Sequence, residues 1–278
     1  MECLETKRKR TMFDLTIPRV MAIINVTPDS FFAGSRTFGC EAIEQRVREA
    51  IEQGCDLFDV GGYSSRAGAE DVPLEEEWRR VETGLGIIRQ LVPTMPVSVD
   101  TFRAEVARRA IEHFGSILIN DISAGELDPA IIDVAARYDV PYIAMHMRGT
   151  PASMQRMTDY HDIVEDVLDY FDRKVAKLHS HGVRQIVLDP GFGFAKTLEQ
   201  NYELLRGLHR LCEKGYPVLA GVSRKSMIYK LLDTTPDQAL PGTIALGWEC
   251  LRQGARILRV HDVREAVDTV RIFNAFQS

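Results

Sequence analysis

The sequence predicts an α/β protein built as a single (β/α)₈ TIM barrel. Short β-branched segments alternate with longer amphipathic segments along the chain, which is typical of a parallel sheet covered by helices. Eight short segments are present, a number that favours a closed barrel over an open doubly wound sheet. The length of 278 residues suits this fold, because such barrels take about 250 residues. We therefore expect one domain over residues 1–278, in which residues 1–15 form a flexible N-terminal extension.

Each expected strand is a short apolar run, as is typical of strands that are buried on both faces of a parallel sheet. The expected strands span residues 20–24, 57–60, 97–99, 117–119, 142–147, 186–188, 217–220 and 257–260. Between them, apolar residues recur at helical spacing, for example at Ile43, Val47 and Ala50. The chain thus alternates strand and helix throughout, as a barrel requires.

Residues that begin and end helices agree with these boundaries. Asp128 followed by Pro129 is typical of a helix N-terminus, and Asp262 with Glu265 resembles a capping box. Four glycines follow helical stretches and precede strands, where a helix C-terminus favours φ above zero. They are Gly54, Gly182, Gly215 and Gly254.

The charge of the chain argues against nucleic-acid and membrane partners. The formal net charge is −6, and the basic residues 7–10 are expected to form a solvated terminus. No segment approaches the roughly 20 consecutive apolar residues of a membrane helix, and no signal peptide is expected. An anionic substrate must therefore be met by a few well-placed cations.

The cysteines favour a reduced, cytoplasmic protein. Their number is odd and they form no C-x-x-C pair, so we expect neither a disulfide framework nor a structural zinc site. They are Cys3, Cys40, Cys55, Cys212 and Cys250.

Polar residues follow the expected strands at the end where barrel enzymes carry their active sites. They are Asn25, Asp100, Asn120, Asp189, Lys225, Arg259 and His261. Each alone also fits a structural role, such as a helix cap for Asp100, a turn for Asn120 or a rim position for His261. Structural roles do not readily explain all seven residues together, because barrel interiors favour branched apolar residues and unpaired buried charges are costly.

The chemistry of these side chains indicates an anionic heterocyclic substrate. Two carboxylates and an amide can pair with a flat heterocycle rich in N–H groups, while Arg259, Lys225 and His261 supply cations for phosphate groups. Asn25, with the hydroxyls of Ser64 and Ser65, offers oxygen ligands to Mg²⁺, which usually keeps several waters and binds substrate phosphates. We therefore expect a heterocycle that carries a pyrophosphate.

The segment GFGFAKT at residues 191–197 looks like a phosphate loop at first sight. It lacks the glycine before the lysine and the full spacing of that motif. We expect it to be the loop after the sixth strand, with aromatic side chains that cover a flat ligand.

Eight ordered motifs, one at each expected strand end, carry a family resemblance. They are NVTPDSF (25–31), DVGGYSSR (59–66), SVDT (98–101), INDI (119–122), MHMRGTP (145–151), LDPGFGF (188–194), SRKS (223–226) and RVHD (259–262). On these motifs the sequence resembles the dihydropteroate synthases along almost its whole length. The resemblance implies an enzyme that joins p-aminobenzoate to 6-hydroxymethyl-7,8-dihydropterin pyrophosphate, with Mg²⁺, by a dissociative route. It also implies a homodimer.

The resemblance implies a role for each matching residue. The pterin would be bound by Asp100, Asn120, Met145, Asp189, Lys225 and Arg259. The pyrophosphate would be bound by Asn25, Ser65, Arg259 and His261, with Asn25 on the metal. The p-aminobenzoate pocket would be formed by Arg66, Phe194, Lys225 and Ser226. The catalytic residues would be Asp100, Asp189 and Lys225.

The sequence departs from the family in its first two loops. Ala67 stands where the family usually has proline, which should loosen that loop. Tyr63 stands where glutamate is common, Ser65 replaces a common threonine, and residues 32–35 replace the usual Ser-Asp-Gly-Gly. The pterin site is therefore the firmer expectation, and the response to sulfonamide analogues of p-aminobenzoate is left open.

Two other functions share part of this pattern. A pterin-binding methyltransferase that passes a methyl group to a corrinoid would share the pterin-reading residues, but the chain has no D-x-H-x-x-G signature and no length for a corrinoid domain. A non-catalytic pterin-binding protein would fit the altered loops, but it would not need the phosphate-side residues Arg259 and His261.

Overall fold

The computed structural model describes residues 14–26, 36–63, 71–150 and 153–277. Within them, eight parallel strands form one sheet in the order β6-β5-β4-β3-β2-β1-β8-β7. The strands are β1 (Arg19–Asn25), β2 (Leu57–Gly61), β3 (Val97–Asp100), β4 (Leu118–Asp121), β5 (Tyr142–Met145), β6 (Ile186–Asp189), β7 (Leu219–Ala220) and β8 (Ile257–Val260). A parallel bridge between Leu188 and Val218 joins β6 to the segment leading into β7, so the sheet closes into a ring. The predicted barrel is confirmed.

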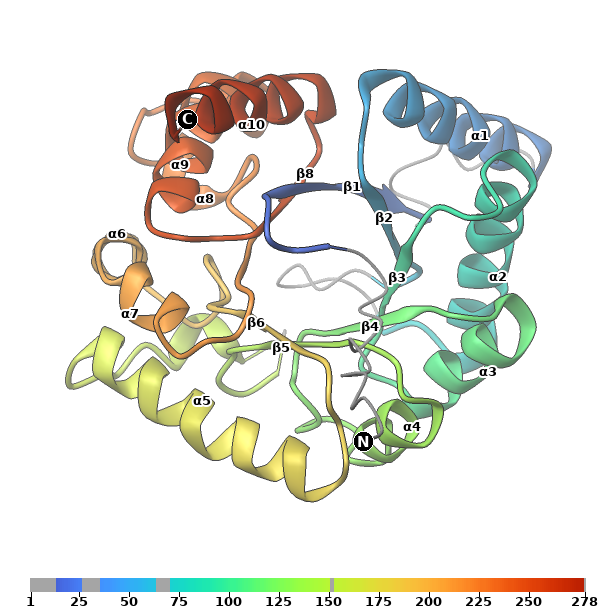
Figure 1. The fold of residues 1–278 in the computed structure, drawn as a ribbon, viewed down its shortest axis with the longest axis horizontal. Coiled ribbons are helices and arrows are strands. Elements are labelled where there is room, and N and C mark those ends of the chain that lie inside the picture. The colour runs from blue at the N-terminus through green and yellow to red at the C-terminus, as the bar shows by residue number, and fades with distance from the viewer. Residues whose placement is uncertain (1–13, 27–35, 64–70, 151–152, 278) are drawn as a thin grey trace, which may run out of the picture.

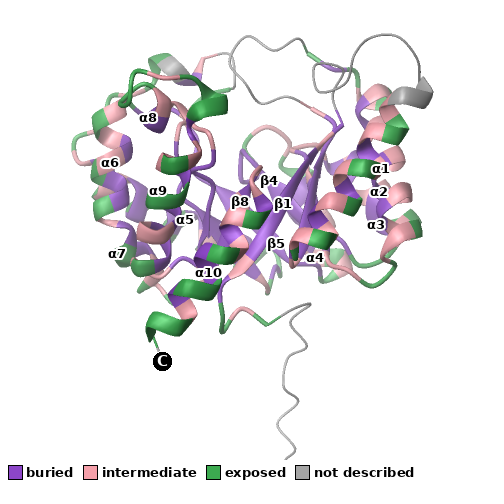
Figure 2. Ribbon diagram, turned by 90° about the horizontal axis from the view of Figure 1, so that it is seen from above, coloured by how far each residue is buried: buried purple, intermediate pink, exposed green. Residues whose placement is uncertain are grey.

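Helices surround this ring (Figure 1). They are α1 (Arg36–Gln53), α2 (Leu74–Leu91), α3 (Ala104–Phe114), α4 (Ala130–Tyr138), α5 (Ile163–Ser180), α6 (Leu198–Arg206), α7 (Leu208–Cys212), α8 (Ser226–Tyr229), α9 (Leu240–Arg252) and α10 (Val263–Gln277). Short 3₁₀ turns lie at η2 (Met154–Arg156) and η3 (Pro236–Gln238). Figure 2 shows that the strands are buried and that the exposed residues lie on the outer sides of the helices.

The predicted strands are present, most of them within one residue of the expected ends; the fourth runs from Leu118 to Asp121 rather than over residues 117–119. The fifth strand ends at Met145 rather than at residue 147. The seventh is only Leu219–Ala220, because its preceding residues make the closing contact with β6 instead: Leu188 N donates to Pro217 O over 2.9 Å. The four glycines predicted at helix C-termini all have φ between 83° and 107°: Gly54 (88°), Gly182 (92°), Gly215 (83°) and Gly254 (107°).

Two aspartates predicted to start helices act differently from one another. Asp128 accepts the backbone N–H of Ala130 at the start of α4 (3.2 Å) and that of Ala104 at the start of α3 (2.8 Å), so it serves two helices. Asp262, expected in a capping box before α10, gives both of its carboxylate oxygens to Arg224. The sequence pattern could not reveal this long-range partner.

The barrel interior changes from apolar to polar along the strands. Near the start of the strands lies an apolar layer of inward side chains: Met21, Leu57, Leu118, Ile143, Val187, Leu219 and Ile257. Leu15, at the end of the expected N-terminal extension, packs against this layer. Since alternate residues of a strand point to the same side, Asp59 follows Leu57 on the inside, and Arg259 follows Ile257. The polar layer therefore begins two residues further along β2 and β8.

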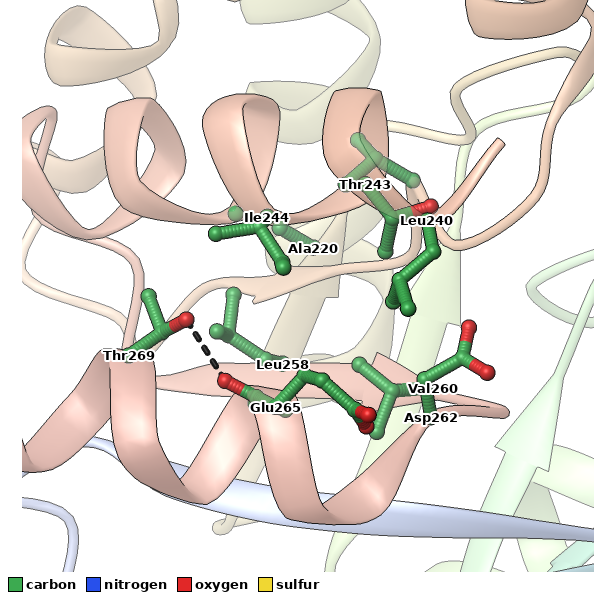
Figure 3. A pocket seen from close by; sticks show the side chains of 12 residues that line it. Ala220, Leu240, Thr243, Ile244, Leu258, Val260, Asp262, Glu265 and Thr269 are labelled. Atoms are coloured by element: carbon green, nitrogen blue, oxygen red, sulfur yellow. Dashed lines mark hydrogen bonds between the residues drawn. The ribbon is translucent and has the colours of Figure 1, made fainter. Parts of the chain in front are cut away.

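Outside the ring, α9 and α10 pack over β7 and β8 and leave a small gap. Figure 3 shows this gap, which is lined by apolar groups of Ile244, Leu258 and Val260, beside the hydrogen bond from Thr269 Oγ1 to Glu265 O (2.7 Å). Its volume is about 10 Å³, which is at the lower limit for a single water. It is a packing gap and cannot hold a substrate.

Candidate active site

A much larger cleft opens at the C-terminal ends of the strands. It has a volume of about 720 Å³, within the range of small-molecule sites. Its wall is formed by the loop after β6, the segment after β7 and the end of β8, and it includes Phe192, Phe194, Lys225, Arg259 and His261. The predicted residue Ser226, at the start of α8, also lines it. This is the end of the barrel at which active sites are expected.

The strand register places three of the predicted site residues at one level. Asn25 pairs with Gly61 of the next strand, Gly61 with Asp100, and Asp100 with Asn120. Gly61 has no side chain, and the place where a Cβ would lie is 3.8 Å from Asn25 Oδ1 and 3.7 Å from Asp100 Oδ2. The glycine therefore leaves the polar atoms of Asn25 and Asp100 facing one another across a gap.

Arg259 is the centre of the polar layer. Its Nε donates to Asp59 Oδ2 over 2.6 Å, and its Nη2 donates to Asp100 Oδ2 over 2.7 Å. Burial alone would lower the pKa of the guanidinium, but the carboxylates of Asp59 and Asp100 raise it above its ordinary value. Arg259 therefore stays charged and fixes two carboxylates from two other strands.

Asp59 is a site residue that the sequence reasoning missed. Its side chain is completely buried, and besides Arg259 it accepts hydrogen bonds from Ser98 Oγ and from Asn120 Nδ2 (3.1 Å). Since a carboxylate only accepts, this bond orients the Asn120 amide with its oxygen free. Asp59 lies in the matched motif of β2, and its alternation with Leu57 and Gly61 was the signal that could have revealed it.

Asp100 is shaped by opposing effects. Burial raises the pKa of its carboxyl to about 7, and the nearby carboxylate of Asp59 acts in the same direction, whereas Arg259 lowers it. The ion pair with Arg259 is thus what favours the charged form of Asp100.

Asp189 and Lys225 form the second charged part of the site. Asp189 Oδ1 accepts the backbone N–H of Gly191 over 2.8 Å, and burial raises the pKa of its carboxyl while Lys225 opposes that rise. Lys225 Nζ donates to the carbonyl of Phe192 and lies 4.6 Å from the centre of the Phe194 ring. Burial lowers the pKa of Lys225 to about 8, and Asp189 opposes this effect.

The segment after β7 that carries Lys225 is fixed by Arg224. Arg224 has a left-handed backbone, with φ of 54°, and its guanidinium binds Asp262 (3.0 and 2.6 Å) and Asp237 (3.2 Å). A left-handed conformation is unfavourable for a residue with a side chain. The double ion pair holds Arg224 in place, and with it the neighbouring Lys225.

His261 lies just after β8, two residues beyond Arg259. Burial, followed by the charges of Arg259 and Arg224, lowers the pKa of its imidazole to about 4. This lowered pKa favours the neutral imidazole, in contrast to the cation expected from the sequence. Ser223 Oγ accepts the backbone N–H of His261 (3.1 Å) and lies 3.1 Å from its Nδ1. The Ser223 hydroxyl and His261 Nδ1 thus share one hydrogen bond, whose direction depends on the tautomer of the imidazole.

Met145 is buried and lies level with Asp189 in the strand register. It belongs to a small apolar cluster with Ile122, Met147, Met154 and Ala195, against which Phe194 packs. This cluster supports the loop after β6 from the side of β5.

The remaining predicted site residues, Ser65 and Arg66, lie outside the described residues, as do Ala67 and residues 32–35. The described part of the chain contains no group of three or more His, Cys, Asp or Glu side chains that could hold a metal ion. Its cysteines Cys40, Cys55, Cys212 and Cys250 are free thiols. No helix among the described residues has the length and apolar character needed to cross a membrane.

Comparisons with known proteins agree with the geometry. Residues 21–261 match the family described as "Pterin binding enzyme". The chain is 42% identical over 259 residues to dihydropteroate synthase of Synechocystis sp., covering 92% of this chain and 89% of the relative. It is 39% identical over 267 residues to dihydropteroate synthase of Escherichia coli, covering 95% and 94% of the two chains.

Solved structures of the same kind superpose on the chain. Xanthomonas albilineans dihydropteroate synthase with 4-aminobenzoic acid has a TM-score of 0.89 at 39% identity, covering 96% of this chain and 95% of that one. The same enzyme in complex with 7,8-dihydropteroate gives 0.85 at 38% identity, covering 96% of each chain. The Yersinia pestis enzyme in a sulfonamide complex gives 0.87 at 37% identity, covering 95% of this chain and 96% of that one.

Proposed function

The chain belongs to the pterin-binding enzymes and, among them, to the dihydropteroate synthases, and from this premise we propose how it acts. It joins p-aminobenzoate to 6-hydroxymethyl-7,8-dihydropterin pyrophosphate and yields 7,8-dihydropteroate and pyrophosphate. The observation that carries the proposal is the set of fixed, charged side chains on the inside of the barrel, at the base of an open cleft.

The polar layer has acceptors free for a pterin. Asp189 Oδ2, Asp100 Oδ1 and Asn120 Oδ1 accept no hydrogen bond from the described residues, while their partner atoms are held by Gly191, Arg259 and Asp59. A pterin ring presents ring N–H groups and an exocyclic amine, which need acceptors. The backbone N–H of Gly191 holds Oδ1 of Asp189 and thereby fixes the orientation of the carboxylate. We therefore assign Asp189 to the exocyclic amine and the adjacent ring N–H of the pterin.

The p-aminobenzoate side of the site lies in the cleft around Lys225. Phe194 presents its ring to the Lys225 ammonium, and Ser226 follows on α8. A carboxylate in this cleft would be met by the Lys225 ammonium, and an aromatic ring by Phe194. Sulfonamide analogues would compete for the same cleft. Arg66 is assigned to this pocket by the family resemblance alone.

The charge balance of the site favours a dissociative route. The carboxylates of Asp59, Asp100 and Asp189 face the cations Arg259 and Lys225. When the C–O bond to pyrophosphate breaks, the pterin methylene gains positive charge, which the fixed carboxylates stabilise. The amine of p-aminobenzoate then forms the C–N bond and releases one proton. In the tautomer in which Nδ1 accepts from Ser223 Oγ, the Nε2–H of His261 would donate a hydrogen bond to the departing pyrophosphate without the imidazole carrying a charge.

Mg²⁺ is the metal that the residues suit. Asn25 Oδ1 accepts no hydrogen bond from the described residues and faces the gap beside Gly61, and a single protein oxygen fits an ion that is held mainly by water and phosphates. Bound there through Asn25, Mg²⁺ would neutralise charge on the pyrophosphate. Ser65 is the second expected contact of the pyrophosphate.

We propose that the protein is a homodimer that pairs through α9 and α10. These helices pack side by side and expose Ile244 (38%), Ile272 (62%) and Phe276 (76%), and Trp248 packs edge-on against Phe276 with 5.8 Å between ring centres. Exposed apolar groups gathered on two adjacent helices are typical of an association surface. A monomeric mass in light scattering would contradict this, and Phe276→Asp is expected to convert a dimer to monomer.

The free thiols of the described cysteines suit a cytoplasmic location.

The test of the function is release of pyrophosphate from the pterin pyrophosphate, with and without p-aminobenzoate and Mg²⁺. We expect release to require both, and dihydropteroate to form in equal amount. Release that ignores both additions, or methyl transfer from methyltetrahydrofolate, would overturn the proposal. Pterin binding without any turnover would identify a non-catalytic binding protein.

A further inference from the structure

The loop after β6 contains a buried lysine that the reaction does not use. Lys196 is the lysine of the segment that looked like a phosphate loop, yet it is only 5% exposed. Its ammonium points into the protein, where Nζ lies 2.9 Å from Gly191 O, 2.9 Å from Phe194 O and 3.0 Å from His146 Nδ1. Burial lowers the pKa of Lys196 well below its ordinary value, and the charge of Asp189 opposes this effect. The charged form has three N–H donors, and each has an acceptor here.

These acceptors come from two different parts of the barrel. Gly191 and Phe194 belong to the loop of Lys196 itself, whereas His146 follows β5. The His146 ring is packed edge-on against Tyr170, with 4.8 Å between ring centres, and is buried. Lys196 therefore links the loop after β6 to the buried His146 side chain, just after the neighbouring strand β5.

The fastened loop carries the groups that surround Lys225. Phe192 offers its carbonyl to the Lys225 ammonium, Phe194 offers its ring, and Gly193 lies under the Lys225 side chain, where a Cβ would be 3.3 Å from Lys225 Cδ. The two carbonyls that Lys196 holds, those of Gly191 and Phe194, bracket this stretch on both sides. Any shift of the loop must therefore shift the surroundings of Lys225.

The loop after β6 requires such side-chain contacts because part of its backbone adopts an unfavourable, left-handed conformation. Ala195 has φ of 50°, in the left-handed region, which a residue with a side chain rarely adopts. Gly191 has φ of 68° and passes so close to His146 that a Cβ would collide with the His146 carbonyl oxygen. Asn201 of α6 assists by accepting the Gly193 N–H (2.6 Å), but it holds only the middle of the loop.

We propose that Lys196 is a positioning residue that sets the p-aminobenzoate side of the site by holding Phe192 and Phe194 around Lys225. The assignment rests on the proposed function, since it presumes that Lys225 and Phe194 meet p-aminobenzoate. It affects the two substrates unequally. Asp100 and Asn120 stand on β3 and β4, which Lys196 does not contact, whereas Asp189 meets the loop only through the Gly191 N–H.

The matched experiment compares two buried lysines. Lys174 of α5 is 4% exposed and donates to a loop carbonyl, Ala124 O, over 2.9 Å, and also to Glu126, but it lies away from the cleft. In Lys196→Met we expect KM for p-aminobenzoate to rise about tenfold, the size of effect that loss of one ammonium–ring contact produces. KM for the pterin pyrophosphate should rise by a smaller factor, because Asp100 and Asn120 keep their partners Arg259 and Asp59. Lys174→Met should lower the melting temperature while leaving both KM values as in the wild type.

A second pair of variants covers the case in which Lys196→Met does not fold. His146→Asn places an amide oxygen near the position of Nδ1 and keeps an acceptor for Lys196, whereas His146→Leu removes it. We expect His146→Leu to raise KM for p-aminobenzoate selectively and His146→Asn to restore it toward the wild-type value.

The outcomes separate a failure of the positioning role of Lys196 from a failure of the proposed synthase activity. If wild-type protein makes no dihydropteroate, the proposed function fails. If the wild type is active and the Lys196 or His146→Leu variants lose only thermal stability, or raise both KM values equally, Lys196 has no positioning role and the function stands.

Discussion

Replacing Asp59 with asparagine tests the ion-pair cluster on which the polar layer depends. The Asp59 carboxylate is fully buried and accepts from Ser98, Asn120 and Arg259. Asparagine keeps the volume and one acceptor oxygen, which Ser98 can still use. It puts an amide N–H₂ where the carboxylate met the donors of Arg259 and Asn120, so donors would face donors.

The expected cost follows from the burial of the pair. Removing one partner of a buried ion pair costs about 3–5 kcal/mol, because the other charge is left uncompensated. Arg259 keeps Asp100 as a second partner at 2.7 Å, so we expect a loss near the lower end, about 3 kcal/mol. For a chain of this size each kcal/mol lowers the melting temperature by about 2–4 °C, which gives a shift of about 6–12 °C.

The assay is urea unfolding followed by circular dichroism, with Asp56→Asn as the matched control. Asp56 also pairs with an arginine on the first strand, Arg19, at 3.0 Å, but both side chains are partly exposed. Asparagine can still accept the Val20 N–H that Asp56 accepts, so the control should lose at most about 1 kcal/mol. If Asp59→Asn unfolds at the same urea concentration as Asp56→Asn, the cluster does not carry the energy assigned to it.

Three further predictions concern the groups around the cluster. Asp189→Ala should weaken pterin binding in calorimetry at least about a hundredfold, because a ligand with two N–H donors loses its charged acceptor; unchanged affinity would contradict the role of Asp189. Lys225→Ala should raise KM for both substrates, since Lys225 stands between Asp189 and Phe194; a change in melting temperature alone would make Lys225 structural. For His261, the folded-state pKa of about 4 lies below the ordinary 6.5, so only the unfolded state takes up the proton as the pH falls from 6.5. Stability should therefore decline between pH 6.5 and 4 by up to about 3 kcal/mol, and urea titrations of His261→Gln should lack that share of the decline.

The fold could be predicted because its signals are local. Each strand is an apolar run and each helix an amphipathic one, and Gly54, Gly182 and Gly254 mark the turns between them. Strand ends that depend on a neighbouring strand are harder to predict. The β7 strand is shortened because Val218 bridges to Leu188, and no local pattern contains that contact.

The site could be predicted only in part, for a similar reason. Asp100, Asn120 and Asp189 stand at strand ends, where a polar residue after an apolar run is conspicuous. Asp59 lies inside a strand, and its importance comes from Arg259, which is 200 residues away in sequence. The neutrality of His261 likewise depends on burial and on Arg259. Interactions of this kind follow from the closure of the barrel, which composition and spacing do not describe.

The contrast between the two inner layers of the barrel separates stability from chemistry. Buried ion pairs are poor stabilisers, because apolar residues of similar volume often serve as well or better. The chain itself shows this alternative: Leu57 and Ile257 fill the apolar layer, and two residues later on the same strands stand Asp59 and Arg259. The interior positions are equivalent in geometry and differ only in their distance from the cleft. The charged cluster is therefore best explained by what the cleft must bind, and the depth at which Leu57 gives way to Asp59 marks the inner limit of the active site.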